Sequence, residues 1–249
     1  MAKTKRLMAA LLTLVMIVCI IPFSVMADGS DGWYKSGDYW YYRKDGQDLT
    51  SQWLKDGGKW YYLSGDGRML QDTIYCENSK VYAFGSSGAM VTKAGWFKMD
   101  LDEYYSYYYG ISEAWFYVKK GGVCVTGWKK ISGKWYYFSP TNSYFIPAIM
   151  VAYNSINDNG TVYAFKKNGQ LQNKTGWVSY KFPHATYWVY LKKGGVCTTG
   201  WKKIGGIWYY FNKSYGDMYC NGTYKIDDIY YQFDENGKCL NPDGSSPAT

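Results

Sequence analysis

The sequence has little of what catalytic and metal-binding sites require. It contains one histidine, His184, in a loop-like stretch, and it has no Cys-x-x-Cys pair. A zinc site needs about four closely placed Cys or His ligands. Three acids at 100–103 could be read as a glycosidase pair, but acids this close within one insert are typical of a solvated loop tip. We therefore expect a protein that is not an enzyme and that uses no cofactor and no metal.

Long hydrophobic runs are absent except at the N-terminus. Lys3, Lys5 and Arg6 precede an apolar run over 7–21, and small residues at 25–27 resemble a cleavage site. This pattern predicts a secretory signal peptide over residues 1–27. An uncleaved anchor is the alternative, although the run is short for a spanning helix of about 20 residues. We expect membrane contact only during export.

Positive charge is also limited once the signal peptide is removed. Residues 28–249 keep 25 basic and 20 acidic side chains, a net charge of +5. Pairs such as Lys129-Lys130 and Lys202-Lys203 recur at equivalent positions, where they are typical of solvated strand edges that discourage aggregation. This composition is a mild bias toward polyanions and gives no indication of nucleic-acid binding.

Aromatic residues are abundant and repeat along the chain. The segment 126–138, TGWKKISGKWYYF, recurs at 199–211 as TGWKKIGGIWYYF, and 19 of 24 positions are identical between 115–138 and 188–211. Weaker copies extend the pattern in both directions, which indicates a repeat architecture. We count nine units between residues 33 and 240. They start near Trp33, Trp53, Ile74, Trp96, Trp128, Tyr153, Trp177, Trp201 and Thr223.

Each unit has the pattern of a β-hairpin. Two β-rich runs flank Ser132-Gly133, and such a pair predicts a two-residue turn. Residue 131 then pairs with 134, 130 with 135, and 128 with 137. Because side chains alternate between faces, Trp128, Trp135 and Tyr137 should share one face. We place the equivalent turns at Ser36-Gly37, Gly57-Gly58 and Gly205-Gly206.

The tryptophans repeat with a longer period. All 12 fall as pairs in six units, and the third, sixth and ninth units have none. This predicts an all-β fold, a β-solenoid of about nine hairpins with three hairpins per turn. Residues 28–249 would form this one repeat domain, with hairpins over about 33–240 and a short polar tail. The fourth and seventh units carry longer inserts, which we expect to make a second contact.

The cysteines follow the repeat. Five remain after residue 27, an odd number, so they cannot all be paired within the chain. Three of them occupy a position at the end of a unit that elsewhere holds Met or Leu, and a position that accepts these residues is apolar. We therefore expect free thiols. The pattern reads Gly-x-Met at Met69, Met90 and Met218, Gly-x-Leu at Leu171, and Gly-x-Cys at Cys124, Cys197 and Cys239.

The motif Thr-Gly-Trp, then Gly-x-Trp-Tyr-Tyr-Phe, then Gly-x-Met resembles the cell-wall-binding repeat of choline-binding proteins and the related glucan-binding repeats of glucosyltransferases and clostridial toxins. The resemblance implies a left-handed solenoid in which aromatic side chains, and often a Met, enclose choline between consecutive hairpins. The candidate ligand-binding residues that the resemblance implies are Trp33, Trp40, Trp53, Trp60, Trp128, Trp135, Trp201 and Trp208, with Tyr42, Tyr62, Tyr137 and Tyr210 as third walls, and Met69 and Met90.

The chemistry of the side chains agrees with this resemblance. A quaternary ammonium donates no ordinary hydrogen bond and is held by electron-rich ring faces, at about 0.5 to 2 kcal/mol per contact. Many weak sites on one chain could bind a repetitive polymer tightly. We expect a secreted, noncatalytic protein held noncovalently at the bacterial surface by choline-substituted teichoic acid. The alternatives are a glucan-binding protein that stacks Trp and Tyr on sugars, an accessory module of a wall hydrolase, and rings that serve only packing.

Overall fold

The computed structural model describes residues 30–101, 103, 112–142, 146–182 and 184–245. The predicted signal peptide and most of the Tyr-rich insert in the fourth unit lie outside these residues. In the described part, all the named elements are β-strands, and none of its segments is a helix with the length and hydropathy needed to cross a bilayer.

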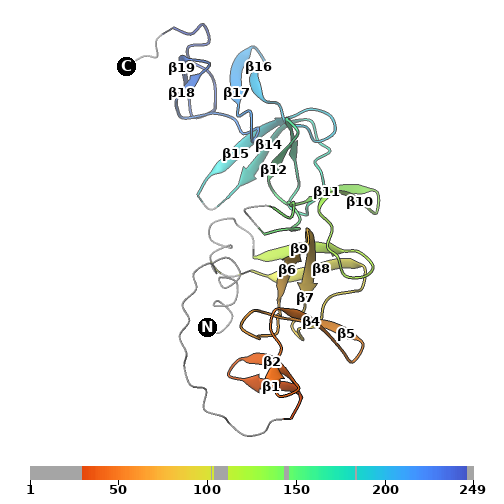
Figure 1. The fold of residues 1–249 in the computed structure, drawn as a ribbon. Helices are drawn as coiled ribbons and strands as arrows, with labels where there is room; N and C mark the ends of the chain where they lie inside the picture. The colour runs from red at the N-terminus through yellow and green to blue at the C-terminus, as the bar shows by residue number, and fades with distance from the viewer. Residues whose placement is uncertain (1–29, 102, 104–111, 143–145, 183, 246–249) are drawn as a thin grey trace, which may run out of the picture. The chain divides into compact units, whose positions relative to one another are not determined.

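The strands form nine antiparallel hairpins in chain order (Figure 1). Hairpins 1 to 4 are β1 Gly32–Ser36 with β2 Tyr39–Lys44, β4 Gln52–Asp56 with β5 Lys59–Leu63, β6 Thr73–Glu77 with β7 Lys80–Phe84, and β8 Gly95–Asp100 with β9 Glu113–Val118. Hairpins 5 to 9 are β10 Gly127–Ile131 with β11 Lys134–Phe138, β12 Ser155–Asp158 with β13 Thr161–Ala164, β14 Gly176–Lys181 with β15 Thr186–Leu191, β16 Gly200–Ile204 with β17 Ile207–Phe211, and β18 Gly222–Ile226 with β19 Ile229–Phe233.

The chain forms two compact units. The first unit contains hairpins 1 to 4 and the second contains hairpins 5 to 9. Within each unit, consecutive hairpins contact one another in chain order. The predicted all-β class and the predicted series of hairpins are confirmed.

The predicted register is confirmed in hairpin 5. Ile131 pairs with Lys134, Lys130 with Trp135, and Trp128 with Tyr137. Ser132 and Gly133 both have positive φ angles, 47° and 77°. Positive φ at both central residues defines the type I′ turn, whose twist matches that of the flanking strands.

The predicted turn of hairpin 1 is wrong by one residue. Ser36 pairs with Tyr39, so the turn residues are Gly37 and Asp38. A turn at Ser36-Gly37 would place Trp33 opposite Trp40, whereas the observed register places Trp33 opposite Tyr42. Moving the turn by one residue shifts the pairing by two residues, so each side chain stays on its predicted face and only its cross-strand partner changes. The observed register keeps Trp33 in line with Trp128.

Backbone hydrogen bonds link consecutive hairpins within each unit. The residue at the end of a repeat, which we call the slot residue, pairs with the last residue of its own hairpin and donates its N–H to a carbonyl of the preceding hairpin. These bonds run from Met69 to Trp40, from Met90 to Trp60 and from Cys124 to Val81 in the first unit, and from Leu171 to Trp135, Cys197 to Val162, Met218 to Trp188 and Cys239 to Trp208 in the second.

The slot residues are apolar, as predicted. Cys124, Cys197 and Cys239 are buried free thiols, and Met69 is buried as well. Hairpin 5 has a slot residue that the Gly-x-Met pattern missed: Met150 pairs with Phe138 in the same way. The sequence there is Ala-x-Met, and Ala148 takes the glycine position with a φ of 58°.

In hairpins 2 to 9, a large and deeply buried side chain ends the second strand or directly follows it. They are Leu63, Phe84 and Val118 in the first unit, and Phe138, Phe165, Leu191, Phe211 and Phe233 in the second. One such residue gives each of these eight hairpins a share of the core, which a single hairpin in water lacks. Tertiary packing between neighbours therefore stabilises each repeat.

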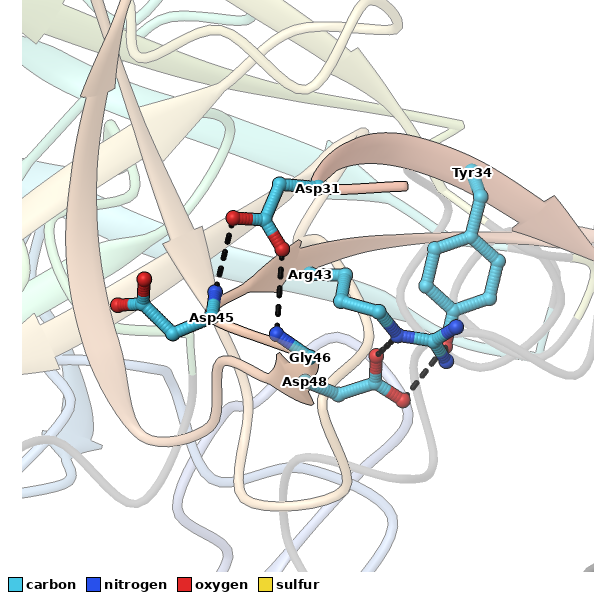
Figure 2. A network of polar contacts seen from close by, with 6 residues as sticks. All are labelled: Asp31, Tyr34, Arg43, Asp45, Gly46 and Asp48. Atoms are coloured by element: carbon cyan, nitrogen blue, oxygen red, sulfur yellow. Dashed lines mark hydrogen bonds and ion pairs between the residues drawn. The ribbon is translucent and has the colours of Figure 1, made fainter. Parts of the chain in front are cut away.

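Polar contacts close the first hairpin at the N-terminal end of the described chain (Figure 2). The short strand β3, Gln47–Asp48, pairs with β2, and the Arg43 guanidinium lies 3.0 Å from the Asp48 carboxylate. Asp31 accepts hydrogen bonds from the backbone N–H groups of Asp45 and Gly46, which lower its pKa. These contacts hold β3 and the turn at Asp45-Gly46 against the first hairpin.

The start of the predicted polar tail is tied to hairpin 9. Asn241 is buried, accepts a hydrogen bond from the backbone N–H of Gln232 and donates to the backbone oxygens of Tyr230 and Ser245. These bonds satisfy backbone groups at the end of the last repeat.

Candidate functional site: aromatic seams between hairpins

The aromatic face of each Trp-containing hairpin forms as the alternation of side chains predicts. The Trp128 ring lies 6.3 Å from the Trp135 ring and 5.3 Å from the Tyr137 ring, and both pairs are edge-to-face. Aromatic rings favour this geometry because the positive edge of one ring meets the negative face of the other. The first-strand Trp and the second-strand Trp therefore stand at right angles to each other.

The next hairpin supplies further rings. Trp128 of hairpin 5 lies 4.9 Å from Tyr163 and 5.7 Å from Phe165, which both belong to hairpin 6 or directly follow it. We call this contact between two consecutive hairpins, centred on a first-strand Trp, a seam. Five seams of this kind are described, with ring centroid distances of 4.8 Å for Trp33–Tyr61, 4.9 Å for Trp53–Tyr82, 4.9 Å for Trp128–Tyr163, 5.0 Å for Trp177–Tyr209 and 4.6 Å for Trp201–Tyr231.

The prediction omitted these tyrosines of the next hairpin, and it also omitted the whole Trp177 seam. The signal was present in the Trp-Tyr-Tyr motif, because adjacent residues of a strand point to opposite faces. In Trp60-Tyr61-Tyr62, Tyr62 contacts Trp53 of its own hairpin, whereas Tyr61 contacts Trp33 of the preceding one. The pairs Tyr61-Tyr62 and Tyr209-Tyr210 thus each serve two seams.

Exposure separates the candidate residues into two groups. The second-strand tryptophans are exposed, from 37% for Trp208 to 45% for Trp135. The first-strand residues Trp33, Trp53, Trp128 and Trp201 are half-buried. The first-strand Trp177 is the exception, since it is 37% exposed. The indoles that are exposed in all five seams are those of the second strand, namely Trp40, Trp60, Trp135, Trp188 and Trp208.

Several other candidates are more buried than a ligand wall would be. Tyr62 and Tyr210, the predicted third walls beside Trp53 and Trp201, are only 7% and 5% exposed, while Tyr42 and Tyr137 are half-buried. Burial raises the pKa of Tyr137 and of Tyr210, so these phenols stay uncharged at neutral pH.

The candidate methionines contact the following repeat. Met69 is 7% exposed, and its terminal methyl group lies against Gly88, while Met90 is half-buried and lies against Gly122. Met has three rotatable bonds and fills irregular gaps of this kind. The structure therefore places both side chains between consecutive hairpins.

Charged groups lie at the edges of the rings. Three first-strand indoles donate their N–H to a carboxylate of the next hairpin: Trp33 to Asp56 at 2.9 Å, Trp53 to Glu77 at 2.9 Å and Trp128 to Asp158 at 2.8 Å. Lysine ammonium groups lie over two second-strand indoles, Lys55 at 5.7 Å from the Trp60 centroid and Lys203 at 5.8 Å from that of Trp208. These distances are within the range of a cation–π contact, so the exposed ring faces already attract a cation.

Metal chemistry has no candidate in the described residues. No group of three or more His, Cys, Asp or Glu side chains there is close enough to hold an ion. Burial raises the pKa of the Cys124 and Cys197 thiols to about 12. Thiols in this state are poor nucleophiles and poor metal ligands, because the thiolate is the reactive form.

Comparison with known protein families identifies the same repeat motif that the sequence shows. A family model described as a putative cell wall binding repeat matches residues 51–69, 126–141 and 199–214. Among curated proteins, no sequence matches the chain. The chain carries the motif most clearly in hairpins 2, 5 and 8, the units with the best-preserved repeats.

Solved structures with a similar course of the chain include CbpJ from Streptococcus pneumoniae TIGR4, with 22% identity, 85% of this chain and 94% of that chain covered, and a TM-score of 0.44. Choline binding protein F from Streptococcus pneumoniae has 22% identity, coverage of 86% and 80%, and a TM-score of 0.47. The modular autolysin LytC from Streptococcus pneumoniae, in complex with a synthetic peptidoglycan ligand, has 26% identity, coverage of 84% and 46%, and a TM-score of 0.37. The resemblance predicted from the motifs is confirmed by the family model: this chain carries putative cell wall binding repeats at residues 51–69, 126–141 and 199–214.

Proposed function

We propose that this protein is a noncatalytic, secreted cell-wall-binding protein whose seams bind the choline groups of teichoic acids. The observation that carries the proposal is the repeated pairing of an exposed second-strand indole with a perpendicular first-strand indole and a tyrosine of the next hairpin. Such a corner offers several ring faces and edges to one quaternary ammonium. The protein would be held noncovalently at the cell surface by its own repeats.

The proposed ligand-binding residues follow from exposure. The second-strand tryptophans Trp40, Trp60, Trp135, Trp188 and Trp208 provide the main surface, and the first-strand tryptophans and the tyrosines of the following hairpin complete each corner. We also propose that the stacked hairpins continue as a solenoid with three hairpins per turn. The repeated slot hydrogen bonds between successive hairpins support this arrangement, because identical contacts repeated along a chain generate a helical stack.

A titration of the whole protein tests the proposal. Choline should change the intrinsic tryptophan fluorescence in a saturable way, because exposed indoles would pass from water into contact with the ligand. Excess free choline should also release the protein from choline-bearing cell walls. An unchanged fluorescence spectrum at high choline concentration would contradict the proposal.

Each alternative function predicts a different experimental result. Exposed Trp and Tyr faces also stack on sugar rings, so saturable quenching by dextran with no response to choline would indicate a glucan-binding protein. Soluble sugar or peptide released from cell walls by the purified protein would indicate a hydrolase. Neither response is expected.

A further inference from the structure

The five seams differ in one respect. In three of them the last residue of the facing first strand is an acid, namely Asp56, Glu77 or Asp158, and its carboxylate accepts the indole N–H at 2.8 to 2.9 Å. In the seams of Trp177 and Trp201, the same position of the facing hairpin holds Ile204 and Ile226.

The carboxylate is held beside the ring that a cation would contact. The carboxylates are half-buried, and the hydrogen bond to the indole fixes one oxygen at the ring edge. A charge in this position attracts a cation on the ring by Coulomb's law, more strongly than in bulk water because the seam lowers the local dielectric. A hydrogen bond to a charged acceptor also polarises its donor, which makes the indole face more electron-rich.

The lysines do not explain this difference between seams. Lys55 lies over Trp60 in a seam with a carboxylate, and Lys203 lies over Trp208 in a seam with Ile226. Both classes of seam therefore have a lysine next to the exposed indole. The acid or isoleucine of the facing hairpin is what separates them.

We infer, on the basis of the proposed function, that the seams form two classes with different ligand selectivity. The carboxylate seams of Trp33, Trp53 and Trp128 select a positively charged headgroup over an uncharged one of the same shape. The isoleucine seams of Trp177 and Trp201 bind mainly by apolar and ring contact and discriminate less. The specificity-determining residues are Asp56, Glu77 and Asp158.

A seam-by-seam titration tests this inference. The indole N–H signals of the protein labelled with ¹⁵N at tryptophan are assigned by single Trp→Phe variants. Choline is titrated first, and then 3,3-dimethylbutan-1-ol, which has the same shape as choline but no charge. We expect choline to shift the Trp128 signal at a concentration about three- to tenfold lower than that needed for Trp177 or Trp201, while the uncharged alcohol acts on all of them at similar concentrations.

The substitution Asp158→Asn removes the charge and keeps an oxygen that can accept the indole hydrogen bond. It should raise the choline concentration needed at Trp128 by about three- to tenfold and leave the response to the alcohol unchanged. Asp45→Asn is the matched control, since Asp45 is exposed in the turn between β2 and β3 and Asn tolerates its φ of 53°. If Asp158→Asn fails to fold, Asp56→Asn provides the same comparison at the Trp33 seam.

The outcomes distinguish this inference from the proposed function. Equal choline affinity at all seams, unchanged by Asp158→Asn, would overturn the inference and leave choline binding intact. If Asp158→Asn weakens the binding of choline and of the uncharged alcohol equally, the inference is also overturned, because the carboxylate would then act through packing. No response to choline at any seam would overturn both.

Discussion

At the scale of single residues, the contact between a slot residue and the glycine of the following repeat controls how closely two repeats approach. A Cβ at Gly88 would lie 2.2 Å from the Met69 terminal methyl carbon, and one at Gly169 would lie equally close to the Met150 sulfur. Gly88 also has a φ of 75°. The glycine of Gly-x-Met is therefore required twice, for its backbone conformation and for its missing side chain.

Gly88→Ala should lower the free energy of unfolding by about 2 to 5 kcal/mol, because backbone strain of about 1 to 2 kcal/mol adds to overpacking of about 1 to 3 kcal/mol. Gly58→Ala is the control, since Gly58 has nearly the same φ, 77°, and nothing near the added methyl group. It should cost only the backbone strain. Urea unfolding of both variants gives the difference. If the two variants are equally destabilised, the contact with Met69 has no energetic role.

The buried slot thiols predict a loss of stability at high pH. Burial raises the pKa of Cys124 and Cys197 to about 12, above their value in the unfolded chain. The folded state therefore holds these protons more tightly, and their contribution to stability is complete below about pH 9 and is lost as the pH rises from about 9 toward 12.

At pH 10.5 this effect should cost on the order of 2 kcal/mol per thiol relative to pH 8. The variant with Cys124→Ala and Cys197→Ala should have a smaller loss of stability between these two pH values than the native protein. Thermal unfolding at both pH values measures the difference. Identical losses would mean that the thiols do not titrate differently in the folded and unfolded chains.

At the scale of the hairpin, the two tryptophans of one unit have different roles. Trp128 contacts Tyr163, Phe165 and Asp158 of the following repeat, so it joins two hairpins. Trp135 of the same hairpin is 45% exposed. In hairpin 5 the first-strand indole thus provides most of the packing and the second-strand indole most of the exposed ring surface. In hairpin 7 the first-strand Trp177 both contacts Tyr209 and is 37% exposed.

Trp128→Ala should therefore destabilise the protein substantially, toward the lower end of the about 3 to 5 kcal/mol that truncation of a buried Trp costs, because Trp128 is half-buried. Trp135→Ala should cost about 1 kcal/mol or less, as exposed positions usually do, and should remove one choline site. Urea unfolding and choline titration, performed on both variants, separate the two effects. A Trp135→Ala protein with native choline stoichiometry would show that the exposed indole is not part of a site.

At the scale of the whole molecule, the proposed function depends on the number of seams. One ring-based site for a quaternary ammonium is weak, at about 0.5 to 2 kcal/mol per contact. Five Trp-centred seams are present in the described residues. A ligand that repeats along a polymer can occupy several of them at once, and the second binding event is then intramolecular.

A polymer bearing many choline groups should bind about 10² to 10⁴ times more tightly than free choline at equal choline concentration. Successive Ala substitutions of Trp60, Trp135 and Trp208 should weaken polymer binding far more than they reduce the binding of free choline. Binding to an immobilised choline polymer measures both quantities. Equal affinity for polymer and monomer would show that the seams do not act together.

Several features could be predicted from local chemistry because they involve residues close in sequence. The two-residue turn at Ser132-Gly133 determines which residues pair, and the two-residue period of a strand then places Trp128, Trp135 and Tyr137 on one face. The apolar slot was predictable for the same reason, since it recurs after hairpins 2 to 9. This reasoning fails where a repeat is aligned wrongly with the others. The turn of hairpin 1 lies at Gly37-Asp38, one residue later than predicted, and the slot residue of hairpin 5 is Met150, which an Ala-x-Met sequence hides from the Gly-x-Met pattern.

Contacts across the seams depend on the tertiary structure. Trp128 and Asp158 are 30 positions apart, and Trp53 and Glu77 are 24 apart. No local pattern pairs them, because how one hairpin is placed on the next is decided by the slot hydrogen bonds and by the buried residue that ends each second strand. The repeated units and their aromatic faces are thus properties of the chain itself. Which indoles remain open to a ligand, and which of them have a carboxylate at the ring edge, is decided only when one hairpin packs against the next.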